Sequence, residues 1–514
     1  MQMHWIDIAI FLAFFAVVIV TSMYKSRREE TGEDFFLAGR DLFWPLIGLS
    51  LIAANISTEH FVGMSGQGAG VMGMAVASYE WVAAITLVFV AIFFLPKFLK
   101  IGIYTIPEFL EYRYNPAARA IMAVYMVVIY VAVSISAVVY TGALTLHTIF
   151  DMNLTHAVWL IAFIAAVYTT WGGLMACAWA DLFQGSALII GGAITMLLGF
   201  KAVGGVHSFF QTNTEKLHMV LPAGHSIIPW TALIIGIWIP NFYYWGLNQF
   251  IIQRALAAKT LKQGQFGVLF AAFLKLTIPF IIIFPGIMAF QLYKDQLTAP
   301  GATTDAAYPL LVKNLIPFGL KGFIFAAIAG AVISTLASML NSGSTILTVD
   351  LYKRHLNKNA SQKSIVTMGR IATLFFVLIV CLIAPKLGNP KFKGIFNYIQ
   401  EFQGYISPGI LAAFAFGLIF KRTPPAAGIT AMLLCVPVYG VLQWKFGHIA
   451  FLNRMAISFG IVILAMAIIT ILKPLKEPKV MPVKQGFDMT SSPLVYWLGA
   501  IVIAITIILY IIFW

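Results

Sequence analysis

A stripe of hydroxyl and amide side chains crosses an otherwise apolar segment about two thirds of the way along the chain. Its members recur at helical spacing: Ser334, Ser338, Asn341, Ser342 and Thr345, with Thr335 beside the first. This spacing puts them on one face of an α-helix. Hydroxyl and carbonyl oxygens without a carboxylate suit a weakly bound monovalent cation such as Na⁺, whereas Ca²⁺ sites recruit Asp or Glu. Close packing of membrane helices also selects small polar residues and is the alternative interpretation.

A run of polar residues interrupts an apolar stretch near the start of the chain. Residues 53–60 read Ala-Ala-Asn-Ile-Ser-Thr-Glu-His and have apolar residues on both sides. A continuous helix facing lipid would not contain such a run, so we expect a local break in the helix. A break frees backbone carbonyl oxygens and exposes two helix ends, which is how transporters build cation and solute sites. A polar helix buried against its neighbours is the alternative.

An aromatic run that contains one amide lies further along, at residues 238–246. Pro240 removes a backbone hydrogen bond and Gly246 permits close approach, so we expect a second interruption inside this run. Aromatic rings pack on the C–H faces of pyranose sugars, and an amide such as that of Asn241 hydrogen-bonds sugar hydroxyls. Packing, or anchoring at the membrane interface, would also account for the rings.

Three charged residues and one further amide lie in apolar surroundings: Glu80, Lys275, Asp181 and Gln400. A charge at membrane depth costs about 3 kcal/mol on insertion scales, so each such residue needs a partner or a function. Glu80 and Lys275 are suited either to bind the hydroxyls of one ligand or to neutralise each other. Asp181 is also consistent with simple placement at a helix N-terminus.

These polar residues belong to a chain that must lie in lipid. Hydrophobic residues make up 61% of its 514 residues and charged residues only 10%, which leaves too little polar surface for a water-soluble protein. About fourteen apolar stretches are long enough to cross a bilayer, and no room remains for a soluble domain. The expected spans are 5–23, 44–68, 74–99, 121–148, 155–173, 181–203, 227–252, 264–293, 308–350, 364–385, 397–419, 426–444, 450–472 and 494–513.

The basic residues indicate how the chain is oriented. Most Lys and Arg residues fall in alternate connections, among them Lys25, Lys97, Arg113, Arg254 and Lys353, which makes that side cytoplasmic and puts both termini outside. Short connections favour a bacterial inner membrane, with the termini in the periplasm. The net charge of +14 follows from the same bias, so nucleic acid is not expected as a partner.

Other functional classes are disfavoured by what the sequence does not contain. It shows no nucleophile–base pair, metal-ligand cluster or phosphate loop, so we do not expect an enzyme. Nothing in it requires an oligomer. The interruptions in spans 44–68 and 227–252 lie five spans apart, which predicts two inverted five-helix units with the site between them.

Several motifs in order resemble the sodium/solute symporter family, specifically its sodium/glucose cotransporter branch, to which the bacterial sodium/galactose transporter belongs. The resemblance covers essentially the whole chain. It is carried by the runs 50–57, 79–81, 104–109, 172–173, 241–246, 253–254, 271–275, 337–342 and 398–401, together with Asp181 and Gln184.

The resemblance implies an all-α LeuT-type membrane fold: ten core helices in two inverted repeats, with one extra helix before and three after. The corresponding divisions are residues 1–25, 44–203, 227–419 and 426–514. The Na⁺ ligands it implies are the backbone carbonyls of Ala53, Ile56 and Ala331 with the hydroxyls of Ser334 and Thr335. The solute contacts it implies are Asn55, His60, Glu80, Asn241, Lys275 and Gln400, with Tyr244 as the inner gate and Met64, Tyr79 and Phe396 as the outer lid.

Two departures from the family pattern bear on the cargo and the coupling. The bacterial galactose transporter has Gln in place of His60 and Ser in place of Ala83, whereas the animal glucose cotransporters have His and Ala, so galactose and glucose both stay open. A second sodium site in some members uses a hydroxyl at the position of Ala337, with Ser334, Ser338 and Asp181; its loss favours one Na⁺ per sugar.

The function implied by the resemblance is import of a hexose such as galactose or glucose, driven by Na⁺ as the coupling ion. The alternatives are Na⁺-coupled symport of another small polar solute, such as myo-inositol or an amino acid, and a passive sugar or water channel.

Overall fold

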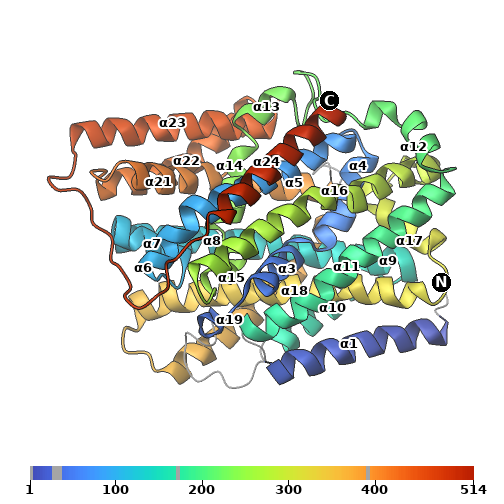
Figure 1. Ribbon diagram of the computed structural model, residues 1–514, viewed down its shortest axis with the longest axis horizontal. Coiled ribbons are helices and arrows are strands. Elements are labelled where there is room, and N and C mark those ends of the chain that lie inside the picture. The colour runs from blue at the N-terminus through green and yellow to red at the C-terminus, as the bar shows by residue number, and fades with distance from the viewer. Residues whose placement is uncertain (1–3, 26–36, 170–173, 389–393) are drawn as a thin grey trace.

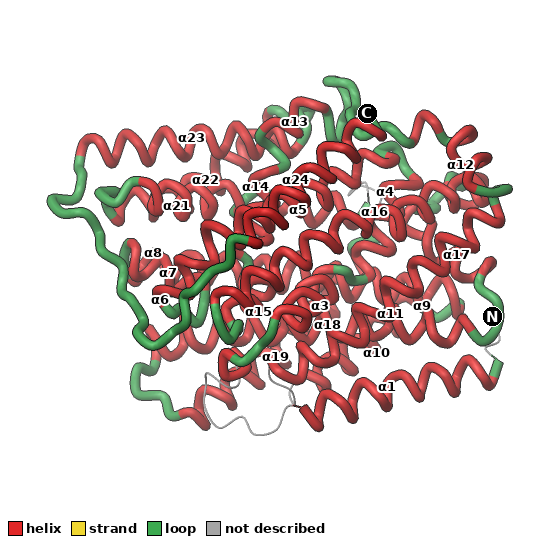
Figure 2. Tube along the Cα trace, in the orientation of Figure 1, coloured by secondary structure: helices red, strands yellow, loops and turns green. Residues whose placement is uncertain are grey.

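The computed structural model describes residues 4–25, 37–169, 174–388 and 394–514. In this part of the chain all regular secondary structure is helical, and a single isolated bridge between Leu42 and Ala258 is its only β contact. Figure 2 shows helices joined by connections that are mostly short. Helices are the expected outcome for these apolar segments, because every backbone N–H and C=O in lipid needs a partner within the same segment.

Several helices in the first half of the chain bend or run on into one another. The main helical elements of this half follow in chain order. They are α1 (Trp5–Lys25), α3 (Trp44–Asn55), η2 (Glu59–Met64), α4 (Ser65–Ala69), α5 (Ser78–Phe89), η4 (Val90–Phe94), α6 (Leu95–Ile101), α7 (Ile106–Arg113), α8 (Pro116–Ile129), η5 (Tyr130–Ile135), α9 (Ser136–Phe150), α10 (Leu154–Thr169), α11 (Leu174–Ala202), α12 (Val206–Thr212), α13 (Trp230–Ile234), α14 (Trp238–Phe242), η7 (Tyr243–Leu247) and α15 (Gln249–Leu256).

The second half contains the longest helix, of 37 residues. The main helical elements of this half follow in chain order. They are α16 (Leu261–Leu297), η8 (Thr304–Ala306), α17 (Ala307–Leu315), α18 (Leu320–Thr345), η9 (Ile346–Leu356), α19 (Gln362–Ile383), α20 (Ile395–Gln403), α21 (Ser407–Ile419), α22 (Pro425–Lys445), α23 (Phe451–Leu472) and α24 (Leu494–Ile512).

Among the described residues, ten helical segments are long and apolar enough to cross a membrane, and two bent helix pairs raise the number to twelve. The bent pairs are α3 with η2 and α4, at 55°, and α20 with α21, at 46°. Two of the fourteen expected spans lie outside this count. Span 155–173 corresponds to α10, which ends where the described residues stop, and span 227–252 is divided into α13, α14, η7 and α15.

Two expected boundaries were wrong. The span expected over 308–350 is two elements, because the chain leaves helical conformation at Ile316 and starts α18 only after Gly319, which has a positive φ of 86°. The interruption expected inside 238–246 lies instead on either side of that run, at Ile235 and at Asn248. Pro240 does not break α14 because it sits in its first turn, where an N–H has no partner along the helix.

The broken helix α3 lies inside the bundle, packed against α11, α16 and α18. The helices run mostly along the horizontal in Figure 1, and both labelled chain ends lie in the right half of that view. At the N-terminal end, the Asp7 carboxylate accepts hydrogen bonds from the N–H groups of Gly319 and Gly322 (2.8 and 2.9 Å). Asp7 therefore caps the start of α18 and joins α1 to it.

Candidate functional site

The expected break in the first core helix is present. Helix α3 ends at Asn55, the next residue Ile56 is extended (φ −77°, ψ 94°), and helical structure resumes at Glu59 as η2. Ser57 organises the turn, since its Oγ accepts from the Glu59 N–H over 3.1 Å and its carbonyl from the His60 N–H over 3.0 Å. The polar residues of the run thus serve the backbone of the break, and the last carbonyls of α3 lie beyond the reach of helical hydrogen bonds.

A small polar pocket opens beside this break. It is enclosed by η2, α5, α14, η7 and α20 and holds a cavity of about 40 Å³. The residues that line it are Asn55, Glu59, His60, Met64, Tyr79, Glu80, Pro240, Asn241, Tyr244, Trp245, Phe396, Gln400 and Gln403. All the solute and gate residues expected from the sequence are in this set except Lys275. Lys275 instead contacts two of the lining residues, Asn55 and Glu80.

Lys275 stands at the centre of the charged groups. Its Nζ donates to the Glu80 carboxylate and to the Asn55 side-chain oxygen, and it lies 4.8 Å from the centroid of the Trp245 ring. His60 Nε2 is 3.5 Å from the other oxygen of Glu80. Lys275 is fully buried and Glu80 is 3% exposed. In this conformation the two charges therefore neutralise each other, which was one of the two roles expected for them.

Aromatic side chains close the pocket on two sides. The rings of Tyr79 and Phe396 meet edge to face with their centroids 4.9 Å apart. On another side, Asn55 Nδ2 donates to the Tyr244 hydroxyl over 3.0 Å. A cavity of this size holds a water molecule or two but not a hexose. Entry of a larger solute requires these contacts to part.

Three polar side chains in the pocket offer atoms to a ligand. His60 Nδ1 and Gln400 Oε1 are buried and have no hydrogen-bond partner within the described part of the chain. Asn241 donates through Nδ2 to the Ile237 carbonyl over 2.9 Å, and its side-chain oxygen is an acceptor that this bond does not use. A buried polar atom without a partner is costly, so a ligand hydroxyl that pairs with it is favoured.

The hydroxyls that were expected to bind the cation lie where α3 meets α18. Thr335 donates its hydroxyl to the Ala54 carbonyl over 3.4 Å, and Ser334 donates its hydroxyl to Asp181. Because both protons point away to other acceptors, the lone pairs of both hydroxyl oxygens stay free to accept a cation. Within the described residues no group of three or more His, Cys, Asp or Glu side chains could hold a metal ion, so the chemistry here is that of hydroxyl and carbonyl oxygens.

A buried charge network backs this region, and the sequence only partly indicated it. Asp181 lies in the second turn of α11, fully buried, and pairs with Arg254 Nη2 at 2.9 Å. Ser50 donates to the same carboxylate over 2.5 Å, and Arg254 also donates to Ser338 over 2.8 Å. Arg254, counted from its charge among the residues of the cytoplasmic side, is 1% exposed. A guanidinium can be buried in this way when a carboxylate and hydroxyls bind it.

Four lining residues were not predicted as solute or gate residues: Glu59, Pro240, Trp245 and Gln403. Glu59 and Trp245 belong to the polar and aromatic runs already identified, so their position in those runs was the signal. Gln403 follows Gln400 by three residues, and this spacing puts both on one face of α20.

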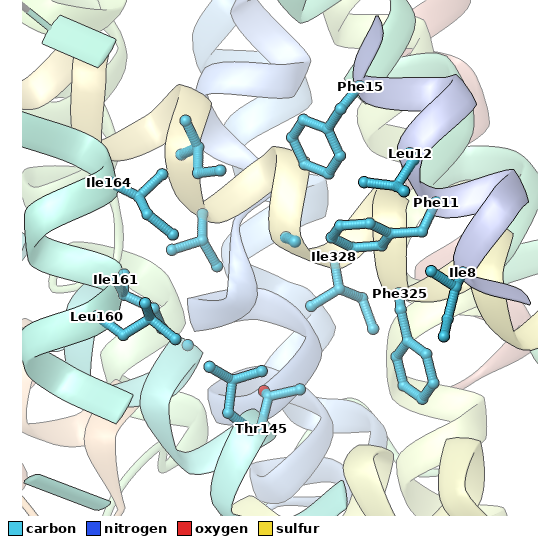
Figure 3. Close-up of a pocket in the computed structure, with 15 residues that line it drawn as sticks. Ile8, Phe11, Leu12, Phe15, Thr145, Leu160, Ile161, Ile164, Phe325 and Ile328 are labelled. Atoms are coloured by element: carbon cyan, nitrogen blue, oxygen red, sulfur yellow. The ribbon is translucent and has the colours of Figure 1, made fainter. Parts of the chain in front are cut away.

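A larger crevice lies elsewhere, between α1 and the helices α9, α10 and α18 (Figure 3). It has a cavity of about 520 Å³ and almost wholly apolar walls, in which Phe11, Ile161 and Phe325 take part. Its one hydroxyl, that of Thr145, donates to a carbonyl of its own helix. The crevice offers no group for a sugar hydroxyl or a cation, so the small polar pocket is the functional candidate.

Broken helices inside a membrane bundle, with a polar pocket beside one break and two buried hydroxyls where α3 meets α18, are the architecture of a secondary transporter. Residues 35–434 match the model of the sodium:solute symporter family. The chain belongs to this family: it is a Na⁺-coupled solute symporter, a multi-pass membrane protein and not an enzyme.

Similar proteins support this placement at the level of sequence and fold. The sodium/glucose cotransporter of Vibrio parahaemolyticus is 39% identical over 547 aligned residues, which cover 100% of this chain and 99% of that protein. Sodium/myo-inositol cotransporter 2 of Sus scrofa is 32% identical over 83% of this chain and 68% of its own length. The solved structure of a Na⁺-coupled sialic acid symporter in a substrate-bound outward-open state superposes with a TM-score of 0.81 at 22% identity, covering 93% and 100% of the two chains, which confirms the LeuT-type fold.

Proposed function

We propose that this transporter imports a hexose, galactose or glucose, together with one Na⁺ ion per sugar. The observation that carries the proposal is the lining of the pocket, which combines amides and two carboxylates with aromatic rings. Two of its buried polar atoms, Gln400 Oε1 and His60 Nδ1, have no hydrogen-bond partner among the residues that the structure describes. Neutral polyols with an apolar ring face fit such a surface. The full-length similarity to a protein named as a sodium/glucose cotransporter supports the same choice.

In the proposed site Asn55, His60, Glu80, Asn241, Lys275 and Gln400 bind the sugar, and Ala53, Ile56, Ala331, Ser334 and Thr335 bind Na⁺. Tyr244 is the gate toward the cytoplasm, and Met64, Tyr79 and Phe396 form the outer lid. Sodium entering from outside stabilises the outward-open arrangement, the sugar binds, the lid closes, and loss of Na⁺ into the cytoplasm releases the sugar. The two repeats, 44–203 and 227–419, move relative to each other in this cycle, in a bacterial inner membrane with both termini outside.

One ion is energetically sufficient for strong accumulation. A charge that crosses about 100 mV releases roughly 2.3 kcal/mol. A tenfold Na⁺ ratio adds about 1.4 kcal/mol, and together these support roughly 500-fold accumulation of a neutral sugar.

A second candidate cargo is myo-inositol, because relatives at 32% identity bear the name of sodium/myo-inositol cotransporters and this polyol presents the same hydroxyl chemistry. Uptake of labelled galactose, glucose and myo-inositol into proteoliposomes, under an inward Na⁺ gradient and with K⁺ as control, separates the candidates. Saturable Na⁺-dependent uptake of a hexose that is lost in Gln400→Ala supports the proposal. Uptake of myo-inositol alone, or uptake that ignores Na⁺, contradicts it.

A further inference from the structure

A partly buried ion pair joins the bent span α20–α21 to the two helices that follow it. Arg454, near the start of α23, donates through Nη2 to both oxygens of the Glu401 carboxylate on α20, over 2.7 and 2.9 Å. The same carboxylate accepts from the Tyr439 hydroxyl and from Gln443 Nε2 on α22, each over 3.0 Å. The Arg454 side chain is 6% exposed and the Glu401 side chain 23% exposed. None of these four residues lines the pocket.

The two halves of this span pack against different neighbours. Helix α20 lies against η2, η5 and α9, whereas α21 packs against α22 and α23, and 46° separates the two halves. Gly404 sits at the bend, so close to Tyr439 that a Cβ added there would lie 2.3 Å from its ring. The polar contacts of Glu401 therefore attach α20 to the same two helices, α22 and α23, against which α21 packs.

The side chains next to Glu401 on the same helix face the pocket. Phe396, Gln400 and Gln403 line it, and Glu401, turned by about 100° from Gln400, points toward α22 and α23. A tilt or rotation of α20 about Glu401 moves all three lining groups together.

We propose that Glu401 and Arg454 are positioning residues for solute recognition. Their ion pair fixes α20 against the C-terminal helices and so places Gln400 and Phe396 over the solute. Packing alone does not require charge at this depth, because an apolar contact between the same helices avoids the desolvation of two ions. The pair supplies direction instead, because Arg454 Nη2 bonds both carboxylate oxygens while Tyr439 and Gln443 bond one of them, and these donors together fix the orientation of the carboxylate. This inference rests on the proposed function in that the solute is taken to bind in this pocket.

The position of α20 can be followed without any solute. Gln400→Cys, in a background in which Cys177, Cys381 and Cys435 are replaced by Ala, is labelled with a membrane-impermeant maleimide. We expect Arg454→Met to change the labelling rate severalfold. Asn453→Ala is the matched control, because Asn453 is the adjacent residue on α23 and donates to Thr231 on α13 rather than to α20; it leaves the rate unchanged.

Transport provides the second readout. In proteoliposomes Arg454→Met raises the solute KM about tenfold, leaves Vmax and the Na⁺ concentration at half-saturation unchanged, and is partly rescued by Arg454→Lys. Should the single variant fail to fold, Glu401→Leu with Arg454→Met removes both charges and serves in its place. An unchanged labelling rate, or an unchanged KM with a lowered Vmax, overturns the inference. If the parent protein moves no hexose, the proposed function fails while the labelling result still decides this inference.

Discussion

Replacing Lys275 by methionine tests the charge balance at the centre of the pocket. Lys275 is fully buried and contacts both Glu80 and Asn55. The substitution leaves the carboxylate of Glu80 buried, with His60 Nε2 at 3.5 Å as a neighbour. Breaking a buried ion pair by removing one partner costs about 3–5 kcal/mol, because the remaining charge is desolvated without compensation. Lys275→Met should therefore lower the stability of the protein by that amount.

The second half of this prediction uses the double variant. Changing Glu80 to Gln as well removes the unpaired carboxylate charge. The double variant Lys275→Met with Glu80→Gln should therefore regain most of the lost stability, but its affinity for the solute should stay low. Thermal unfolding of purified protein gives the stabilities, and solute-dependent shifts in unfolding temperature give the binding. Lys259→Met is the control, since it breaks the exposed Lys259–Asp41 pair and should change little. A Lys275→Met protein as stable as the parent, or a double variant no more stable than the single one, would refute the reasoning.

Three further predictions concern the cation site, a connection outside the spans and a close helix contact. Ser334→Ala removes a proposed Na⁺ ligand and a donor to Asp181, so the Na⁺ concentration for half-maximal uptake should rise about tenfold. Ser344→Ala is the control, because the Ser344 hydroxyl donates to the Asn341 carbonyl of its own helix, and it should not shift this concentration. Equal Na⁺ dependence in both variants contradicts the assignment. Asp305 lies in the connection between α16 and α18, and burial raises its pKa to about 7. The folded protein is therefore most stable at low pH, where the carboxyl is protonated, and it loses this stability as the pH rises through about 7 and the buried group ionises. Asp305→Asn, which is neutral throughout, should exceed the parent in unfolding temperature by more at pH 8 than at pH 5, and a difference that does not vary with pH would argue against this. A Cβ at Gly286 would lie 2.1 Å from the Ser65 carbonyl oxygen, so Gly286→Ala should lower the free energy of unfolding by about 1–3 kcal/mol or more. Gly224→Ala is the control, because a Cβ there meets no described atom within 4 Å, and it should not lower the stability. Equal stability of the two variants would contradict the close contact.

The break in the first core helix could be predicted from sequence because an unbroken helix in lipid rarely tolerates a run of consecutive polar residues. The second interruption was placed wrongly, since Pro240 was taken as a helix breaker although its effect depends on where the helix starts. The extended residue Asn248, whose side chain accepts a hydrogen bond from Tyr130, carries no such local signal.

The residues of the pocket were predicted better than the network behind it. Glu80, Lys275 and Gln400 stand out because charges and amides are costly in lipid. Arg254 did not stand out, because a single arginine near the end of a span was counted only toward the charge bias between the two sides. Its burial depends on Asp181, Ser50 and Ser338, which come from three other helices. The contacts of Glu401 were not predicted for the same reason, as pairing across helices cannot be read from one segment.

The most direct test of coupled transport is the sugar gradient that a known Na⁺ gradient sustains at zero membrane potential. Proteoliposomes with equal K⁺ on both sides and a K⁺ ionophore in the membrane are given a tenfold inward Na⁺ ratio, and the steady-state ratio of free galactose or glucose is measured. With one Na⁺ per sugar, the sugar should accumulate about tenfold. Accumulation of about a hundredfold would contradict the stoichiometry, and a ratio that stays at one would contradict Na⁺-driven import of the hexose.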